Sequence, residues 1–250
     1  KYLDLGGGQV LLGDPELDAV AVCTPPFAHL EYGLAAIEAG KHLLMEKPMG
    51  RTADEAQRLV DAAGGRDGLV VSGCTARYGR LNAKFDTVKA LIDEGKLGRV
   101  YHIHHRDVKR QGRAGIEYNP GAKWFQDRRK AGGGPLLDWG GYDLAFHLGL
   151  AGDPAFQSAT AFCIRGLDDV DAGTAVGDVE EHGAAMMRFE GGLTYYWERA
   201  GNAHGESPHQ TSIYGTRGGV RLGYCSWDSP DIEVFSVDGK GKARVDTVTV

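Results

Sequence analysis

The chain has 250 residues, of which 42% are hydrophobic and 25% charged, a composition typical of a soluble globular protein with one or two domains. The net charge is −6, and no basic stripe offers itself to nucleic acid, so nucleic-acid binding is disfavoured. No apolar run approaches the roughly 20 residues that crossing a bilayer requires, which argues against a membrane protein. The four cysteines lie far apart without a CxxC pair. They predict free thiols in a reducing compartment, the cytoplasm.

Residues 18–77 alternate between short apolar runs and stretches with helical spacing. Runs this apolar suit parallel strands that are buried on both faces. Strands that alternate with helices imply a parallel sheet with right-handed crossovers. Strands are expected at 18–24, 41–45 and 69–73, and helices at 27–39 and after the capping box Thr52-Ala-Asp-Glu55.

After about residue 78 the pattern changes to a few helices with strands and hairpins. Apolar periodicity predicts an amphipathic helix at 81–94, a strand at 100–108 and a helix around 138–150. Turn residues predict two hairpins, one pairing 184–189 with 193–197 and one pairing 209–214 with 220–222. The second region, 78–250, therefore reads as an antiparallel or mixed sheet with helices. The domain boundary is placed near Arg77.

Lys47 lies just past the carboxyl end of a predicted parallel strand, in the run Met45-Glu46-Lys47-Pro48. Ligands of open α/β sheets bind outside those strand ends. A lysine there can bind a substrate hydroxyl and stabilise a developing alkoxide, and Glu46 could hold its ammonium in place. Pro48 fixes the backbone where the strand ends, and a cis bond is possible there. The alternative is a solvated loop lysine.

Asp138 and Tyr142 are four residues apart and follow a run of three glycines at 132–134. On a helix this spacing puts both side chains on one face, and the glycines allow backbone to approach a ligand closely. A tyrosine beside a lysine can serve as a proton donor or acceptor, because the cation favours phenolate. The alternative makes Asp138 a helix cap and Tyr142 a packing residue.

Thr24-Pro25-Pro26-Phe27-Ala28-His29 stands where a strand ends and a helix begins. Free backbone N–H groups at such a helix start suit the polar groups of a cofactor. His29 could equally be an exposed residue of the first helical turn. His102 and His104 share one face of a predicted strand. Nothing points to a third ligand, so no metal site is expected.

These three signals occur in an order that resembles the glucose–fructose oxidoreductase / inositol dehydrogenase / rhizopine catabolism (Gfo/Idh/MocA) family. The resemblance covers nearly the whole chain. It implies a Rossmann-type NAD(P) domain in residues 1–77, followed by an α+β domain with a large open-faced, mostly antiparallel sheet in residues 78–250. In this family such a sheet often forms the oligomer interface, so a homodimer or homotetramer is expected.

The resemblance also implies roles for individual residues. Lys47 would lie beside the nicotinamide of NAD or NADP and the reacting hydroxyl, Asp138 would bind a substrate hydroxyl, and Tyr142 would relay the proton. The cofactor would be lined by Thr24, Pro25, His29, Glu46, Lys47 and Trp124.

Two features depart from the family pattern. Tyr142 stands where most members have histidine, although glucose–fructose oxidoreductase itself has tyrosine there. Gly6-Gly7-Gly8 is not a dinucleotide fingerprint, because Leu11 stands where the third glycine would be. The opening part of the Rossmann domain is therefore expected to be missing, and the sequence to be a piece of a longer protein. NAD cannot be told from NADP without that segment.

The predicted activity is an NAD(P)-dependent dehydrogenase or reductase acting on the CH–OH group of a sugar, polyol or related hydroxy compound. Two alternatives remain on the same fold. One is an NAD-dependent glycosidase that uses a transient oxidation. The other is a non-catalytic sensor that binds a dinucleotide, against which the presence of both Lys47 and Asp138 argues.

Overall fold

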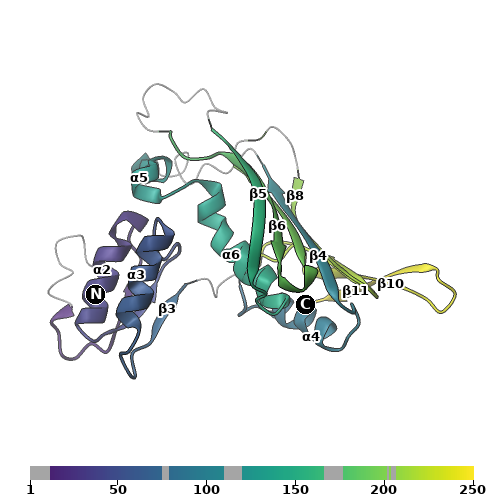
Figure 1. Cartoon of the computed structure of the whole chain (residues 1–250), viewed down its shortest axis with the longest axis horizontal. Coiled ribbons are helices and arrows are strands. Elements are labelled where there is room, and N and C mark those ends of the chain that lie inside the picture. The colour runs from purple at the N-terminus through teal and green to yellow at the C-terminus, as the bar shows by residue number, and fades with distance from the viewer. Residues whose placement is uncertain (1–11, 75–78, 110–119, 166–176, 202, 204–206) are drawn as a thin grey trace.

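The computed structural model describes residues 12–74, 79–109, 120–165, 177–201, 203 and 207–250. The predicted boundary at Arg77 and the glycines at 6–8 lie outside these residues. A small three-stranded sheet with its helices stands beside a large eight-stranded sheet, and helix α6 (Pro135–Leu150) lies between them (Figure 1). Among the described residues no helix is both long and apolar enough to span a bilayer.

The small sheet is parallel, as predicted, with strand order β1-β2-β3. Its strands and covering helices are β1 (Ala19–Val22), η1 (Pro26–Ala28), α2 (His29–Glu38), β2 (His42–Met45), α3 (Ala53–Ala63) and β3 (Val71–Gly73). Helices α2 and α3 pack on one face, where Leu43 and Met45 are buried, whereas Leu44 on the other face is 46% exposed. The prediction of burial on both faces is therefore wrong here, because helices cover only one face of the described sheet.

The start of α3 follows the predicted capping box only in part. The Thr52 side chain accepts a hydrogen bond from the Glu55 backbone N–H. Glu55 does not reach back to Thr52 but binds both the backbone N–H and the guanidinium of Arg51. The box thus holds the loop that follows Lys47 as well as the helix.

The large sheet is mostly antiparallel, with strand order β11-β10-β9-β8-β4-β7-β6-β5. Among its described strands, only the neighbours β4 and β7 form a parallel pair, near the middle of the sheet. Both predicted hairpins are confirmed, as β6 with β7 and β8 with β9. The strands are β4 (Val100–Val108), β5 (Phe156–Ile164), β6 (His182–Phe189), β7 (Thr194–Ala200), β8 (Ser207–Gly215), β9 (Gly219–Leu222), β10 (Asp231–Val237) and β11 (Ala243–Thr249).

Two helices cover one face of the large sheet, α4 (Ala83–Asp93) and α6 (Figure 1). The main core lies between them and the strands, around Phe146, Tyr195 and Ile213, each at most 1% exposed. Helix α6 begins at Pro135, three residues before the predicted start, because proline suits the first helical turn. Short helices lie along the chain before it: η2 (Pro120–Gln126) and α5 (Arg128–Ala131), with η3 (Glu190–Gly192) in the β6–β7 turn.

Candidate active site

A pocket of about 350 Å³ lies at the carboxyl ends of β1 and β2, where the sequence predicted a ligand site. Its far wall comes from α6 and the short helices before it, so residues far apart in sequence face one cavity. It is lined by Cys23, Thr24, Pro25, Pro26, Glu46, Lys47, Pro48, Trp124, Phe125, Ala131, Gly133, Leu137 and Asp138.

The ammonium of Lys47 contacts the first turn of α6. It donates one hydrogen bond to the Asp138 carboxylate and one, of 3.0 Å, to the Asp138 backbone oxygen. The two side chains are 19% and 22% exposed, so a ligand in the pocket can reach both. Lys47 is therefore not a solvated loop lysine, and Asp138 is not the helix cap, since Gly134 occupies that position.

Glu46 does not hold the ammonium, contrary to the sequence-based expectation. Its carboxylate accepts a 3.0 Å hydrogen bond from the backbone N–H of Lys47 instead. The Lys47–Pro48 peptide bond is cis. Glu46 therefore shapes the turn that carries Lys47, while Asp138 pairs with the charge.

Tyr142 lies one turn beyond Asp138 on α6, as the spacing predicted. The Lys47 Nζ lies over its ring, 5.3 Å from the ring centroid. The ring is 5% exposed and packs against Trp139, with 5.5 Å between centroids. Lys47, Asp138 and Tyr142 thus come together, and the role of Tyr142 in proton transfer stays a prediction.

The glycines before α6 allow close approach to other backbone segments of the chain, at Arg51 and Glu180. Gly132 has φ of +88°, and a side chain there would meet the Arg51 backbone at 2.9 Å. A side chain at Gly134 would lie 2.0 Å from the Glu180 backbone oxygen. The Glu180 carboxylate also accepts hydrogen bonds from the backbone N–H groups of Gly134 and Leu136, at 2.8 and 3.2 Å. Glu180 therefore caps the helix that carries Asp138, a contact that sequence spacing could not reveal.

His29 is fully buried, so it is not the exposed first-turn residue considered from the sequence. Its Nδ1 lies 2.7 Å from the Pro48 oxygen and its Nε2 2.7 Å from the Thr24 oxygen. The ring thus ties together the two loops that line the pocket. Its direct contact with a cofactor stays a prediction.

The residues at the strand ends fit a bound dinucleotide. Thr24 lines the pocket, and its buried Oγ1 has no hydrogen-bond partner among the described residues, which leaves a polar atom for a ligand. Trp124 stacks on Phe125 at the opposite wall. Together with Pro25 they form a surface that is part apolar and part polar, the character of cofactor sites.

A second polar cluster lies beneath α6 and was missed by sequence reasoning. Asp143, His105 and His147 are all 0% exposed. Burial acts to raise the pKa of Asp143, but the charge of Arg199 and its hydrogen bonds hold it well below its usual range. Burial lowers the pKa of both histidines. The only sequence signal was charged and polar residues at inward positions of an apolar helix and strand.

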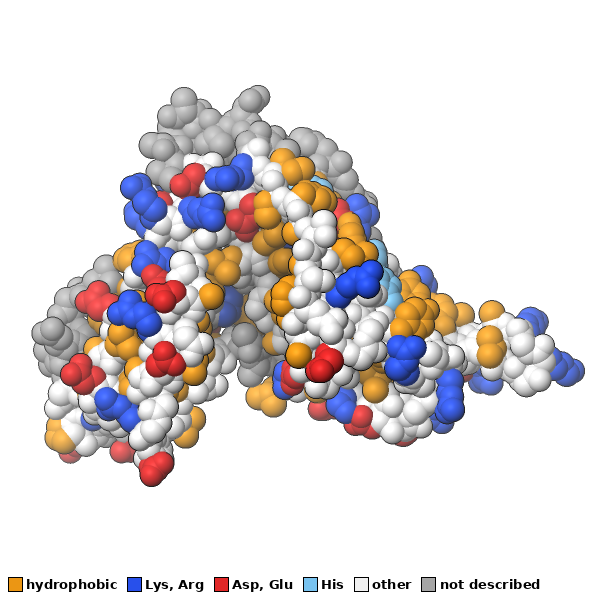
Figure 2. Space-filling view, viewed as in Figure 1, with side chains coloured by type: hydrophobic (Ala, Val, Ile, Leu, Met, Phe, Trp, Pro, Cys, Tyr) orange, Lys and Arg blue, Asp and Glu red, His pale blue; other side chains and the backbone are white. Residues whose placement is uncertain are grey.

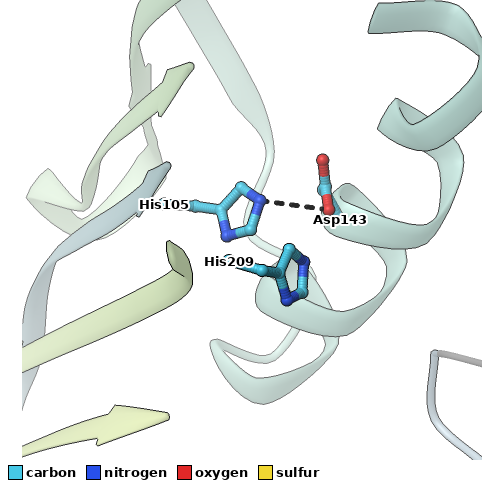
Figure 3. Close-up of side chains that lie close together, drawn as sticks. All are labelled: His105, Asp143 and His209. Atoms are coloured by element: carbon cyan, nitrogen blue, oxygen red, sulfur yellow. Dashed lines mark ion pairs between the residues drawn. The ribbon is translucent and has the colours of Figure 1, made fainter. Parts of the chain in front are cut away.

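The atoms of His105, Asp143 and His209 lie close enough together to hold a metal ion (Figure 3). Arg199 argues against that reading. Its guanidinium donates to both oxygens of Asp143, at 2.5 and 2.8 Å, and lies 3.5 Å from His209. The Arg199 guanidinium already supplies the positive charge that neutralises Asp143, so this cluster does not call for a metal ion.

Residues 85–221 match the GFO/IDH/MocA C-terminal domain, and residues 8–73 match the oxidoreductase family with an NAD-binding Rossmann fold. The chain therefore belongs to the Gfo/Idh/MocA oxidoreductase family, which confirms the resemblance and the fold predicted from the sequence.

Curated relatives of the chain include a dehydrogenase and a reductase. The chain is 29% identical over 231 residues to a levoglucosan dehydrogenase of Pseudarthrobacter phenanthrenivorans, covering 86% of this chain and 57% of the relative. It is 34% identical over 205 residues to a 1,5-anhydro-D-fructose reductase of Ensifer adhaerens, covering 79% and 57%. The chain thus spans little more than half the length of these relatives.

Solved structures show the same fold. A levoglucosan dehydrogenase in complex with NADH and levoglucosan superposes with a TM-score of 0.81 at 25% identity, covering 97% of this chain and 63% of that one. An inositol dehydrogenase homologue from Azotobacter vinelandii complexed with NAD⁺ gives 0.74 at 24% identity, covering 97% and 59%. The second likeness shows the fold alone.

Proposed function

We propose that this protein is an NAD(P)-dependent oxidoreductase that transfers hydride between nicotinamide and a hydroxyl-bearing carbon of a sugar or polyol. The observation that carries the proposal is the contact between Lys47 and Asp138 in a pocket at the ends of parallel strands. The relatives named for levoglucosan, anhydrofructose and inositol support a substrate with several neighbouring hydroxyl groups.

Lys47 acts on the reacting hydroxyl. An ammonium has three N–H donors, and Asp138 takes two of them. The third is left for the substrate oxygen, where it stabilises the negative charge that develops as the hydroxyl proton leaves. When bound, the nicotinamide supplies the acceptor or donor of hydride.

Asp138 and Tyr142 position the substrate and handle its proton. Asp138 is partly exposed and accepts a hydrogen bond from a sugar hydroxyl while it holds the ammonium. Tyr142, one helical turn away, receives or returns the hydroxyl proton. Thr24 and Pro25 at the end of β1, Trp124 opposite and Glu46 beside Lys47 line the cofactor side.

Replacement of the lysine tests the assignment. Lys47→Met is expected to slow single-turnover reduction of bound NAD(P) by at least about 100-fold, the cost of losing one such donor. Lys41→Met is the matched control, because Lys41 lies at the opposite end of β2 and binds the Asp14 backbone oxygen. An undiminished rate in Lys47→Met would remove Lys47 from the mechanism.

We also propose that the open face of the large sheet joins copies of this chain in a homodimer or homotetramer. Hydrophobic and histidine side chains gather on the side of the sheet turned away from α6 (Figure 2). Three large hydrophobic residues on this side, Phe162, Met186 and Tyr214, are 49%, 44% and 44% exposed. Between them, His104 stacks on Tyr196 with 4.9 Å between centroids. A contiguous exposed face of this kind is typical of an interface.

Sedimentation velocity tests this part of the proposal. Met186→Glu is expected to lower the molecular mass toward that of a monomer. Leu81→Glu is the control, since Leu81 is 79% exposed but lies before α4, outside that face. A monomeric unmodified protein, or an unchanged mass in Met186→Glu, would contradict it.

A further inference from the structure

Helix α6 presents two polar flanks with different surroundings. Asp138 faces Lys47 at the pocket, and the buried ring of Tyr142 lies under the Lys47 ammonium. Asp143, the next residue after Tyr142, turns toward the sheet and is completely buried. No step of the proposed reaction uses Asp143. Burying a carboxylate costs folding free energy, which its pairing partners must offset, so its presence here needs an explanation.

The carboxylate of Asp143 is surrounded by polar groups from two strands, β4 and β7, and from the loop after β9. One oxygen accepts hydrogen bonds from Trp197 Nε1 at 2.7 Å and Arg199 Nε at 2.5 Å. The other accepts Arg199 Nη2 at 2.8 Å and the Tyr224 hydroxyl, and lies 3.3 Å from His105 Nε2 (Figure 3). A planar guanidinium bound at two points fixes both the position and the orientation of its carboxylate.

A separate chain of hydrogen bonds lies next to Asp143 and reaches His147 on α6. His105 Nδ1 lies 2.9 Å from Thr211 Oγ1, which lies 2.8 Å from His147 Nε2, and His147 Nδ1 lies 2.6 Å from the Tyr195 hydroxyl. The His105 Nε2 lies 3.3 Å from the Asp143 carboxylate without a hydrogen bond among the described residues, so the contact between the two is electrostatic.

Ring contacts connect the Asp143–Arg199 pair to Lys47. The Arg199 guanidinium lies over the Trp139 ring, 4.8 Å from its centroid. Trp139 in turn packs on Tyr142, whose ring lies under the Lys47 ammonium. Gly140 faces Trp197, and a side chain there would lie 3.2 Å from its ring, so this flank of α6 lies tightly against β7.

We propose that Asp143 is a positioning residue for the proposed reaction. Bound through Arg199, it fixes the rotation of α6 and thereby the places of Asp138 and Tyr142 relative to Lys47. The inference rests on the proposed function, because it concerns the same three groups. Small displacements of such groups are costly: about 1 Å can cost about 100-fold in rate.

The chain offers a matched control on the same guanidinium. Arg199 also donates to Asp107, which lies on β4 and is 3% exposed. Asp107→Asn and Asp143→Asn each remove one buried carboxylate charge from Arg199. Only Asp143 is part of α6, so the two variants separate loss of charge from loss of the anchor.

Steady-state kinetics on the intact protein with NAD(P)⁺ and an oxidisable sugar or polyol test the proposal. Asp143→Asn is expected to lower kcat about 10- to 100-fold with less than threefold change in KM for the cofactor, and Asp107→Asn to lower kcat less than threefold. Arg199→Lys keeps the charge but loses the two-point contact. Arg199→Lys is also expected to lower kcat, and it replaces Asp143→Asn as the test variant if Asp143→Asn does not fold.

A second readout does not depend on activity. Reductive ¹³C-methylation gives each lysine an NMR signal, and that of Lys47 is assigned by its loss in Lys47→Arg. The signal is expected to shift in Asp143→Asn and to stay in place in Asp107→Asn. If the unmodified protein oxidises no substrate, the proposed function fails, while this comparison still decides the inference. An unmoved signal in Asp143→Asn, or equal kcat losses in both aspartate variants, would overturn it.

Discussion

The two carboxylates of α6 show how one helix serves two purposes. Asp138 is 22% exposed and pairs with a single lysine at the pocket. Asp143 is 0% exposed and is bound by tryptophan, arginine and tyrosine donors. A partly exposed pair can exchange partners when substrate arrives, whereas a saturated buried pair cannot. The contrast separates the part of the helix that meets ligands from the part that holds it in place.

The largest expected effect is on stability at the buried carboxylate. Asp143→Ala leaves the Arg199 charge buried with one partner fewer, and it should lower the free energy of unfolding by about 3–5 kcal/mol. Asp138→Ala should lower it by no more than about 1 kcal/mol, because its pair with Lys47 is partly exposed. Urea denaturation measures both values. Equal losses in the two variants would erase the distinction.

A pH dependence of stability follows from the histidines of the buried cluster. Burial lowers the pKa of His105 and His147 below the value they have in the unfolded chain. Their stabilisation is therefore present above the unfolded pKa of about 6.5 and is lost as pH falls below it. Each can contribute a slope of up to about 1.4 kcal/mol per pH unit.

Denaturation curves between pH 7 and pH 5 measure this slope. His147→Gln should flatten it, since one of the two neutral histidines is then gone. A slope that is the same in His147→Gln and the unmodified protein would show that other groups set the acid limit.

A smaller effect is expected at the start of α6. Glu180→Ala removes the acceptor for the backbone N–H groups of Gly134 and Leu136, and should cost about 1 kcal/mol, as other helix caps do. Asp178→Ala is the control, because Asp178 binds the Arg128 N–H at the start of α5 rather than α6. A shift of kcat in Glu180→Ala alone would show that the cap, like Asp143, positions Asp138.

Much of the fold was predictable because local patterns carry it. Apolar runs with intervening helical spacing gave the three parallel strands, and the turn at Glu190-Gly191-Gly192 gave the β6–β7 hairpin. Lys47, Asp138 and Tyr142 were proposed from strand ends and i, i+4 spacing together with the family resemblance, and the structure brings them together, while their roles stay predictions.

Contacts that join distant segments could not be predicted. The partner of Lys47 is 91 residues away, so neighbouring Glu46 was chosen wrongly. Glu180 caps a helix about 45 residues earlier in the chain, and Asp143 meets Arg199 56 residues later. Such pairs depend on how the sheet and α6 pack, which spacing along one segment does not encode.

Transfer of deuterium from substrate to cofactor tests whether this protein catalyses hydride transfer with the help of Lys47. The intact protein is incubated with NAD⁺ or NADP⁺ and a panel of sugars and polyols deuterated at their hydroxyl-bearing carbons, and the reduced cofactor is analysed by mass spectrometry. With at least one substrate, the reduced cofactor is expected to be one mass unit heavier and to form at least about 100-fold more slowly in Lys47→Met. Cofactor that binds but gains no deuterium from any member of the panel would contradict the proposed hydride transfer.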